Sequence, residues 1–268
     1  MLRLDTLPAA TAKVFAHLYA EPLLAGFTLI GGTALSLQVA HRQSEDLDFY
    51  CPGERLPGRT LSTALSHARR AGFAVQDMLS PSAISQTRIH YAVDLHDWVQ
   101  DWAVGGVKVS FSVFQGFVPQ MRAIMAYPRA ADADATTAVD AAASGDVQRF
   151  SILGIEGLFA AKSCLLMRRA RSRDLFDLYT LMHTHGYSAR QLFDVIRRID
   201  PTANADHHRD VLRGLIPLDA TDEGFSGIGV NVSLATLYAF FEERISEYEC
   251  EEARRIVAAI TRNDAAQK

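Results

Sequence analysis

The sequence predicts an α+β protein in which a small mixed sheet with its helices is followed by a C-terminal helical domain. Residues 1–128 alternate short β-rich runs with amphipathic segments of helical period, whereas residues 149–268 carry mainly helical periodicity. Residues 129–148 between them are biased toward Ala, Asp and Thr, which favours a linker or an insertion. We therefore expect an α/β domain over 1–128 and a helical domain over 149–268.

Apolar spacing and breaker residues predict the individual elements. In the first domain we expect helices over residues 8–20, 34–41 and 59–72, and strands over 26–30, 47–51, 73–78, 88–96 and 107–114. The last two strands are separated by Gly105-Gly106. In the second domain we expect helices over 155–170, 173–186, 189–199 and 234–260.

Composition narrows the class of protein. The 268 residues are 49% hydrophobic and 22% charged, as in a soluble globular protein, and the net charge of −4 does not demand nucleic acid or an anionic membrane as partner. The three cysteines are odd in number and far apart, with neither a disulfide framework nor zinc-ligand spacing, which favours a reducing, cytoplasmic setting. The uncharged stretch over residues 22–41 is interrupted by glycines, so we expect no membrane span.

A double glycine follows the first expected strand. Gly31 and Gly32 let the backbone approach a bulky anion, because no Cβ atoms intervene. Thr33 stands at or near a helix start, where free N–H groups and the positive end of the helix dipole favour phosphate. Taken alone, this stretch favours a tight turn in which Thr33 caps the helix.

Two carboxylates follow one short helix later. Asp46 and Asp48 are two residues apart in an expected strand, so they project to the same face and repel each other unless a cation lies between them. Oxygen ligands beside open water positions suit Mg²⁺ or Mn²⁺, which hold the phosphates of a nucleoside triphosphate. A solvated acidic strand edge is the alternative, and the preceding strand and double glycine favour the metal site.

The string GGTALSLQVAHRQSEDLDFY resembles the AbiEii/AbiGii toxin family of nucleotidyltransferases, within the superfamily that resembles DNA polymerase β. That family carries GG-[ST]-A-L and then H-R-x-S-x-D-[LI]-D-F. The chain matches this pattern at Gly31, Gly32, Thr33, His41, Arg42, Ser44, Asp46, Asp48 and Phe49. The resemblance implies that Arg42 joins Gly31, Gly32 and Thr33 in binding the nucleotide.

A later string, AAKSCLLMRRARSRDLFDLYTL, resembles the family's second motif. The matching positions are Lys162, Arg169, Arg173, Asp174, Asp177 and Leu178. The whole resemblance covers roughly residues 25–50, 105–115 and 152–182, in the family's order. It implies a functional role for Asp174, as an added base or a nucleotide contact, and it implies that the nucleotide lies between the two domains.

The residues of the second motif carry charge of their own. If residues 162–173 form one helix, Lys162, Arg169 and Arg173 lie near one face, and no acid follows Glu156 before Asp174 to compensate them. Lys162 and Arg169 are therefore candidate nucleotide contacts, and a solvated basic helix face is the alternative. We also expect Ser172 to cap the next helix, and Asp177 to be structural and to pair with an arginine.

Transferases that resemble DNA polymerase β usually add a third carboxylate from a later strand. The strand that fits is 107–114, where Ser110 occupies the expected position. Either another acid, such as Asp94 or Asp174, supplies the base, or the chain binds nucleotide without catalysis. The sequence therefore predicts a transferase in which Asp46, Asp48 and Asp174 are catalytic, with a nucleotide-binding or protein-interaction module as the rival.

The resemblance also implies a biological setting. The chain is expected to move a nucleoside monophosphate from an NTP to the 3′ end of a tRNA or to a protein hydroxyl. The same resemblance implies the toxin of a toxin–antitoxin or abortive-infection pair, with a cognate antitoxin as partner. No lysine of the Walker type follows the glycines, which argues against a phosphate-loop ATPase.

Overall fold

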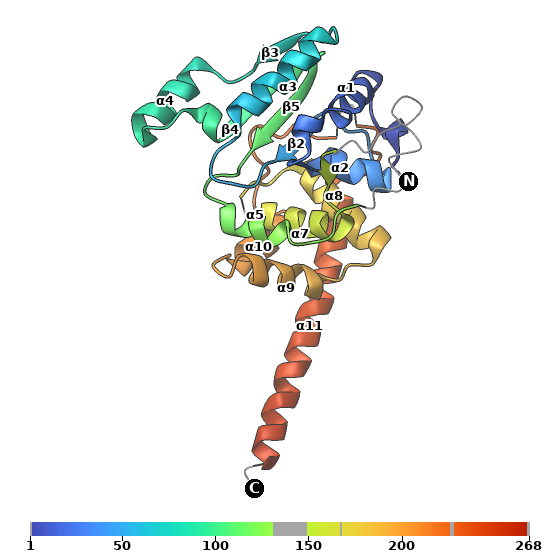
Figure 1. Ribbon diagram of the computed structural model, residues 1–268. Coiled ribbons are helices and arrows are strands. Elements are labelled where there is room, and N and C mark those ends of the chain that lie inside the picture. Colours follow the sequence, from blue (N-terminus) through green and yellow to red (C-terminus); the bar gives the residue numbers. More distant parts are fainter. Residues whose placement is uncertain (1, 131–148, 167, 226–227, 267–268) are drawn as a thin grey trace. The chain divides into compact units, whose positions relative to one another are not determined.

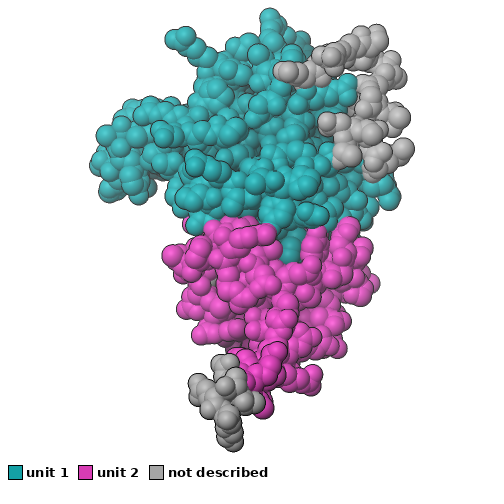
Figure 2. Space-filling view, turned by 60° about the horizontal axis from the view of Figure 1, so that its bottom comes forward, with its two compact units in different colours: residues 1–161, 227–229 teal, residues 162–226, 230–268 magenta. Residues whose placement is uncertain are grey.

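The computed structural model describes residues 2–130, 149–166, 168–225 and 228–266 (Figure 1). The chain divides into two compact units (Figure 2), unit 1 being Met1–Ala161 with Gly227–Gly229 and unit 2 being Lys162–Ser226 with Val230–Lys268. The expected linker over 129–148 lies outside the described residues except for its first two positions. The predicted domain limits stay a prediction.

Unit 1 is built on a six-stranded mixed sheet, in the order β3-β4-β5-β2-β1-β6. The strands are β1 (Thr28–Ile30), β2 (Leu47–Tyr50), β3 (Val75–Asp77), β4 (Val99–Val104), β5 (Val107–Ser112) and β6 (Ser151–Ile152). Strand β2 runs antiparallel to β1 and parallel to β5, and β4 and β5 form an antiparallel hairpin. The α+β class with a mixed sheet is confirmed.

One face of this sheet carries the aromatic core of unit 1. The ring of Phe49 in β2 lies 5.2 Å from that of Phe111 in β5 and 4.9 Å from that of Phe150, and Phe150 also contacts Phe15. In β5 buried and half-buried residues alternate along all six positions, as in a strand with one face on a core. The neighbours of Phe49 in sequence therefore project to the other face.

The described helices that lie wholly within unit 1 are α1 (Ala9–Tyr19), α2 (Gly31–Val39), α3 (Gly58–Arg70), α4 (Pro81–Tyr91) and α5 (Val118–Ile124). Short 3₁₀ turns cover Leu4–Thr6, Pro22–Leu24 and Leu95–Asp97. The expected helices over 8–20, 34–41 and 59–72 are confirmed as α1, α2 and α3. Helix α2 begins at Gly31, directly after β1, which is earlier than the sequence predicts.

The prediction of a strand over residues 88–96 is wrong. That stretch contains the end of α4, a left-handed Ala92 and a 3₁₀ turn. Helix α4 begins because the Ser80 hydroxyl accepts a hydrogen bond from the Ala83 N–H and Pro81 occupies the first helical position. These start signals outweigh the apparent alternation, and the strand before Gly105-Gly106 is β4 instead.

Unit 2 is helical. Its elements are the end of α7 (Ile155–Leu165), then α8 (Ser172–His185), α9 (Ala189–Ile199), α10 (Ala205–Leu212) and α11 (Leu234–Ala266). Helices α8, α9 and α10 each pack against α11, and the second half of α11 extends beyond α9 (Figure 1). Among the described residues, no helix is both long and apolar enough to cross a membrane.

The prediction of one continuous basic helix over residues 162–173 is wrong. Helix α7 ends at Leu165 and α8 begins at Ser172. The turn between them is held by acids from a distant segment, because the Ser172 N–H and hydroxyl both donate to Asp222, at 3.0 and 2.9 Å. Ser172 is thus the first residue of α8 rather than its cap.

Candidate active site

The double glycine lies where β1 turns into α2. Gly31 has a φ of +75°, and a Cβ atom there would lie 2.9 Å from Oδ2 of Asp48. A Cβ atom on Gly32 would collide with the guanidinium of Arg42. The two glycines therefore do more than clear the backbone for a ligand, because they let Asp48 and Arg42 reach the first turn of α2.

Thr33 joins the two halves of the motif. Its side chain is buried, its hydroxyl donates to the backbone carbonyl of Asp46, and the Ser44 hydroxyl lies 2.7 Å from it. The hydroxyl thus fixes the segment carrying the carboxylates beside the helix start. A direct contact of this hydroxyl with phosphate stays a prediction.

The two carboxylates face away from the core. Asp46 is exposed just before β2 and Asp48 is half-buried within it, while Leu47 and Phe49 are buried. Within the described parts of the chain, no group of three or more His, Cys, Asp or Glu residues can hold a metal ion. Two carboxylates still fit Mg²⁺, which is commonly held by one or two carboxylates together with substrate phosphates and water.

The third-carboxylate position is occupied as the sequence predicts. Ser110 in β5 lies directly beside Asp48, and the residue opposite Ser110 in β4 is Asp101. Residues paired across neighbouring strands share a face, so Asp48, Ser110 and Asp101 form one row. Asp101 is half-buried, and two strand spacings place its Cα roughly 9.6 Å from that of Asp48. Sequence reasoning missed Asp101 because it misplaced the strand.

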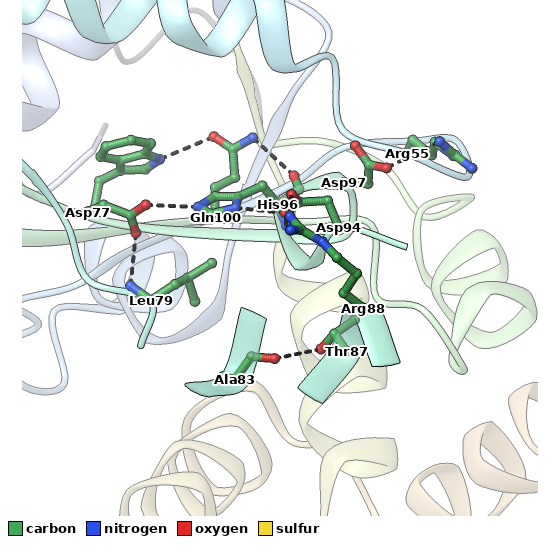
Figure 3. Close-up of polar contacts among 11 residues, drawn as sticks. Arg55, Asp77, Leu79, Ala83, Thr87, Arg88, Asp94, His96, Asp97 and Gln100 are labelled. Atoms are coloured by element: carbon green, nitrogen blue, oxygen red, sulfur yellow. Dashed lines mark hydrogen bonds and ion pairs between the residues drawn. The ribbon is translucent and has the colours of Figure 1, made fainter. Parts of the chain in front are cut away.

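Asp94, considered as a base, belongs to a separate polar network (Figure 3). It accepts from the His96 N–H at 3.0 Å and from Arg88 at 2.8 Å, while the His96 ring lies 2.9 Å from Asp94 and 2.8 Å from Asp77. The hydrogen bond from the His96 N–H, with further help from its ring, lowers the pKa of Asp94 to about 2. A carboxyl with so low a pKa is a weak proton acceptor.

The second motif forms a buried charge cluster in unit 2. Nζ of Lys162 lies 2.7 Å from Oδ1 of Asp174 and 2.5 Å from Oδ2 of Asp177, and Nε of Arg169 donates to Oδ2 of Asp174 at 2.8 Å. Lys162, Asp174 and Asp177 are 4%, 2% and 0% exposed. Burial alone would raise the pKa of Asp174, but Lys162 and Arg169 outweigh it and lower that pKa.

Arg173 of this motif is compensated by an acid that lies far away in the sequence. Arg173 lies 3.0 Å from Glu223, and Asp177, expected to pair with an arginine, pairs with Lys162. Roles of Lys162, Arg169 and Asp174 toward a nucleotide stay predictions.

A match to a protein-family model shows which family the chain belongs to. The model for the nucleotidyl transferase AbiEii toxin of type IV toxin–antitoxin systems matches residues 13–247, most of the chain. The chain belongs to this family. As an AbiEii-family protein it is a member of the nucleotidyltransferase toxins of type IV toxin–antitoxin systems, and the resemblance inferred from the two motifs is confirmed.

Solved structures add distant likenesses. MenT4, a nucleotidyltransferase toxin from Mycobacterium tuberculosis, is 15% identical, with a TM-score of 0.48 over 88% of this chain and 84% of that one. JHP933 from Helicobacter pylori is 16% identical, with a TM-score of 0.44 over 96% and 99% of the two chains. No curated protein matches the chain. The assignment therefore depends on the family model.

Proposed function

We propose that this AbiEii-family protein transfers a nucleoside monophosphate from an NTP to an acceptor hydroxyl. The observation that carries the proposal is the approach of Asp48 to the first turn of α2. Its Oδ2 lies 2.9 Å from the position that a Cβ atom on Gly31 would occupy. This approach puts a metal-binding carboxylate beside a helix N-terminus, whose free N–H groups favour phosphate. The metal at Asp48 and the triphosphate at the N-terminus of α2 would thus be bound side by side.

The residues of unit 1 have separable tasks in this reaction. Asp46 and Asp48 would hold Mg²⁺ or Mn²⁺, which supplies positive charge to the triphosphate. The N–H groups of Gly32 and Thr33 would donate to the β- and γ-phosphates. The Arg42 guanidinium, which approaches Gly32, would neutralise phosphate charge. The acceptor oxygen bonds to the α-phosphorus, the bond from that phosphorus to pyrophosphate breaks, and the acceptor proton passes to a carboxylate.

Two carboxylates compete for the role of base. Asp174 is the choice that the family motif implies, but its oxygens already accept from Lys162 and Arg169, and its lowered pKa weakens it as a proton acceptor. Asp101 lies on the same sheet face as Asp48, one strand beyond Ser110. We favour Asp101. The contributions of Lys162 and Arg169 to phosphate binding are proposed from the motif.

The acceptor and the partner are proposed from the family, and the setting is proposed from the cysteines. By its family the protein has an antitoxin, and we propose a tRNA 3′ end or a protein hydroxyl as acceptor. We also propose a cytoplasmic setting, since Cys51, Cys164 and Cys250 are free thiols. The second candidate function is a nucleotide-binding module without catalysis, which is favoured by Ser110 standing beside Asp48.

The test is label transfer from each of four labelled NTPs with Mg²⁺, using total tRNA or cell extract as acceptor. Wild type should transfer label and Asp48→Ala should not. Asp97→Ala is the matched control, because its carboxylate pairs with exposed Arg55 outside the motif. Nucleotide binding by wild type without transfer from any NTP would replace the transferase with the binding module.

A further inference from the structure

Unit 1 contains a cavity of about 610 Å³ whose lining includes none of Gly31, Gly32, Thr33, Asp46 and Asp48. Its walls come from the beginnings of β1 and β6, the end of β2, helix α5 and the turn after α5. The polar side chains among its lining are those of Thr28, Tyr50, Glu54, Arg122, Arg129 and Ser151. A volume of this size suits a ligand as large as a nucleotide.

Arg129 is fixed in this cavity by neutral groups. Its Nε donates to the Ser151 hydroxyl at 3.2 Å, and its Nη1 donates to the carbonyls of Met125 and Tyr127 at 3.0 and 2.9 Å. No carboxylate in the described part of the chain forms an ion pair with it. The guanidinium is half-buried, and it stays charged at neutral pH. A half-buried cation with no counter-ion among the described residues favours an anionic ligand.

Further donors surround the same space. Arg122 projects from α5, exposed and without an ion pair among the described residues, and the buried Tyr50 brings a phenol. The Thr28 and Ser151 hydroxyls lie 2.9 Å apart. Glu54 on the exposed rim is the one acid among the lining residues, so the cavity has a net charge of +1. Guanidinium forks and hydroxyls together match the oxygens of phosphate.

The cavity is next to the proposed metal site without being part of it. Tyr50 follows Asp48 by two residues in β2, so both side chains project to the same sheet face, roughly 6.6 Å apart along the strand. We propose that this cavity binds a phosphate group, carried either by a free nucleotide or by a polynucleotide chain. The proposal concerns binding alone and does not depend on transfer at Asp48.

The test is a binding assay on the full chain in EDTA, which suppresses metal-dependent binding at the acid pair. The probe is a fluorescent penta-adenylate without a terminal phosphate, followed by anisotropy, with AMP, inorganic phosphate and adenosine as competitors. The variants are Arg122→Gln and Glu54→Gln. Arg70→Gln is the matched control, being an exposed arginine of α3 outside the cavity.

Arg122→Gln should weaken probe or AMP binding about tenfold, and Glu54→Gln should strengthen it, while Arg70→Gln should match wild type. Tighter AMP binding supports the proposal with free nucleotide as the source of phosphate, and tighter probe binding supports it with a polynucleotide as the source. Equal affinities of Arg122→Gln and Arg70→Gln would overturn it. Competition by adenosine as strong as that by AMP would overturn it too.

Discussion

The two motifs of this AbiEii-family protein use the same kinds of side chain in opposite surroundings. In unit 1, Asp46 is exposed just before β2 and Asp48 is half-buried within it. In unit 2, Lys162, Asp174 and Asp177 are buried and ion-paired with one another. Accessible carboxylates can bind a metal, whereas buried charges that pair with one another contribute mainly to the stability of the fold. The comparison predicts that the first motif governs activity and the second governs stability.

The largest expected effect is on the stability of unit 2. Lys162→Met removes the cation shared by Asp174 and Asp177 and leaves their carboxylates buried without it. Breaking a buried ion pair in this way should lower the unfolding free energy by about 3–5 kcal/mol. Urea denaturation followed by circular dichroism measures it. Lys13→Met, at an exposed position of α1, is the control and should change little; equal effects of the two variants would remove the contrast between the motifs.

Acid should destabilise unit 2 through His208. Burial lowers the pKa of His208 to about 3 from an ordinary 6.5, so the unfolded chain takes up the proton first. The contribution of His208 is complete above pH 6.5, and it falls by up to about 1.4 kcal/mol per pH unit as the pH drops toward 3. His208→Gln should flatten this slope in urea titrations, and exposed His185→Gln should not. A wild-type stability that is flat between pH 7 and 5 would contradict this.

The row formed by Asp48, Ser110 and Asp101 predicts a smaller effect on catalysis. Asp101→Asn should lower kcat roughly 100-fold, with little change in the KM for NTP or in stability. The acidic limb of the pH profile of kcat/KM should also be lost, which a purely structural role would not cause. Asp97→Asn is the control. An unchanged pH profile would return the role of base to Asp174.

The smallest expected effect comes from the glycine turn. Gly31→Ala imposes a left-handed alanine, which costs about 1–2 kcal/mol, and its Cβ would displace the Asp48 carboxylate. Metal-dependent NTP binding should weaken together with thermal stability. Gly58→Ala is the matched control, since nothing lies within 4 Å of a Cβ there. If Gly31→Ala bound NTP normally, the approach of Asp48 to α2 would not matter for the ligand.

Local patterns were sufficient for much of unit 1. The breaker glycines and apolar spacing place β1, α2 and β2, and hence Gly31, Asp46 and Asp48. Residues 88–96 failed because alternation over a few residues is a weak signal beside a capped helix start at Ser80. With β4 placed correctly, Asp101 could have been found, because it precedes Gly105 by four residues as Ser110 follows Gly106 by four.

Other contacts depend on tertiary structure that no short window contains. The hydroxyl of Thr33 meets the Asp46 carbonyl across 13 residues of sequence. The turn before α8 is held by Asp222, 50 residues beyond Ser172. Because that turn separates α7 from α8, Lys162 reaches Asp174 instead of aligning with the arginines. Charge spacing along an assumed helix therefore gave the right residues and the wrong geometry.

The central claim is that Gly31, Gly32, Asp46 and Asp48 form one metal and nucleotide site. Mn²⁺ binding followed by electron paramagnetic resonance, with and without a non-hydrolysable NTP, tests it most directly. Wild type should bind Mn²⁺ more tightly with the nucleotide, and Asp48→Asn should lose this gain while Asp97→Asn keeps it. Equal Mn²⁺ and nucleotide binding by wild type and Asp48→Asn would contradict the account.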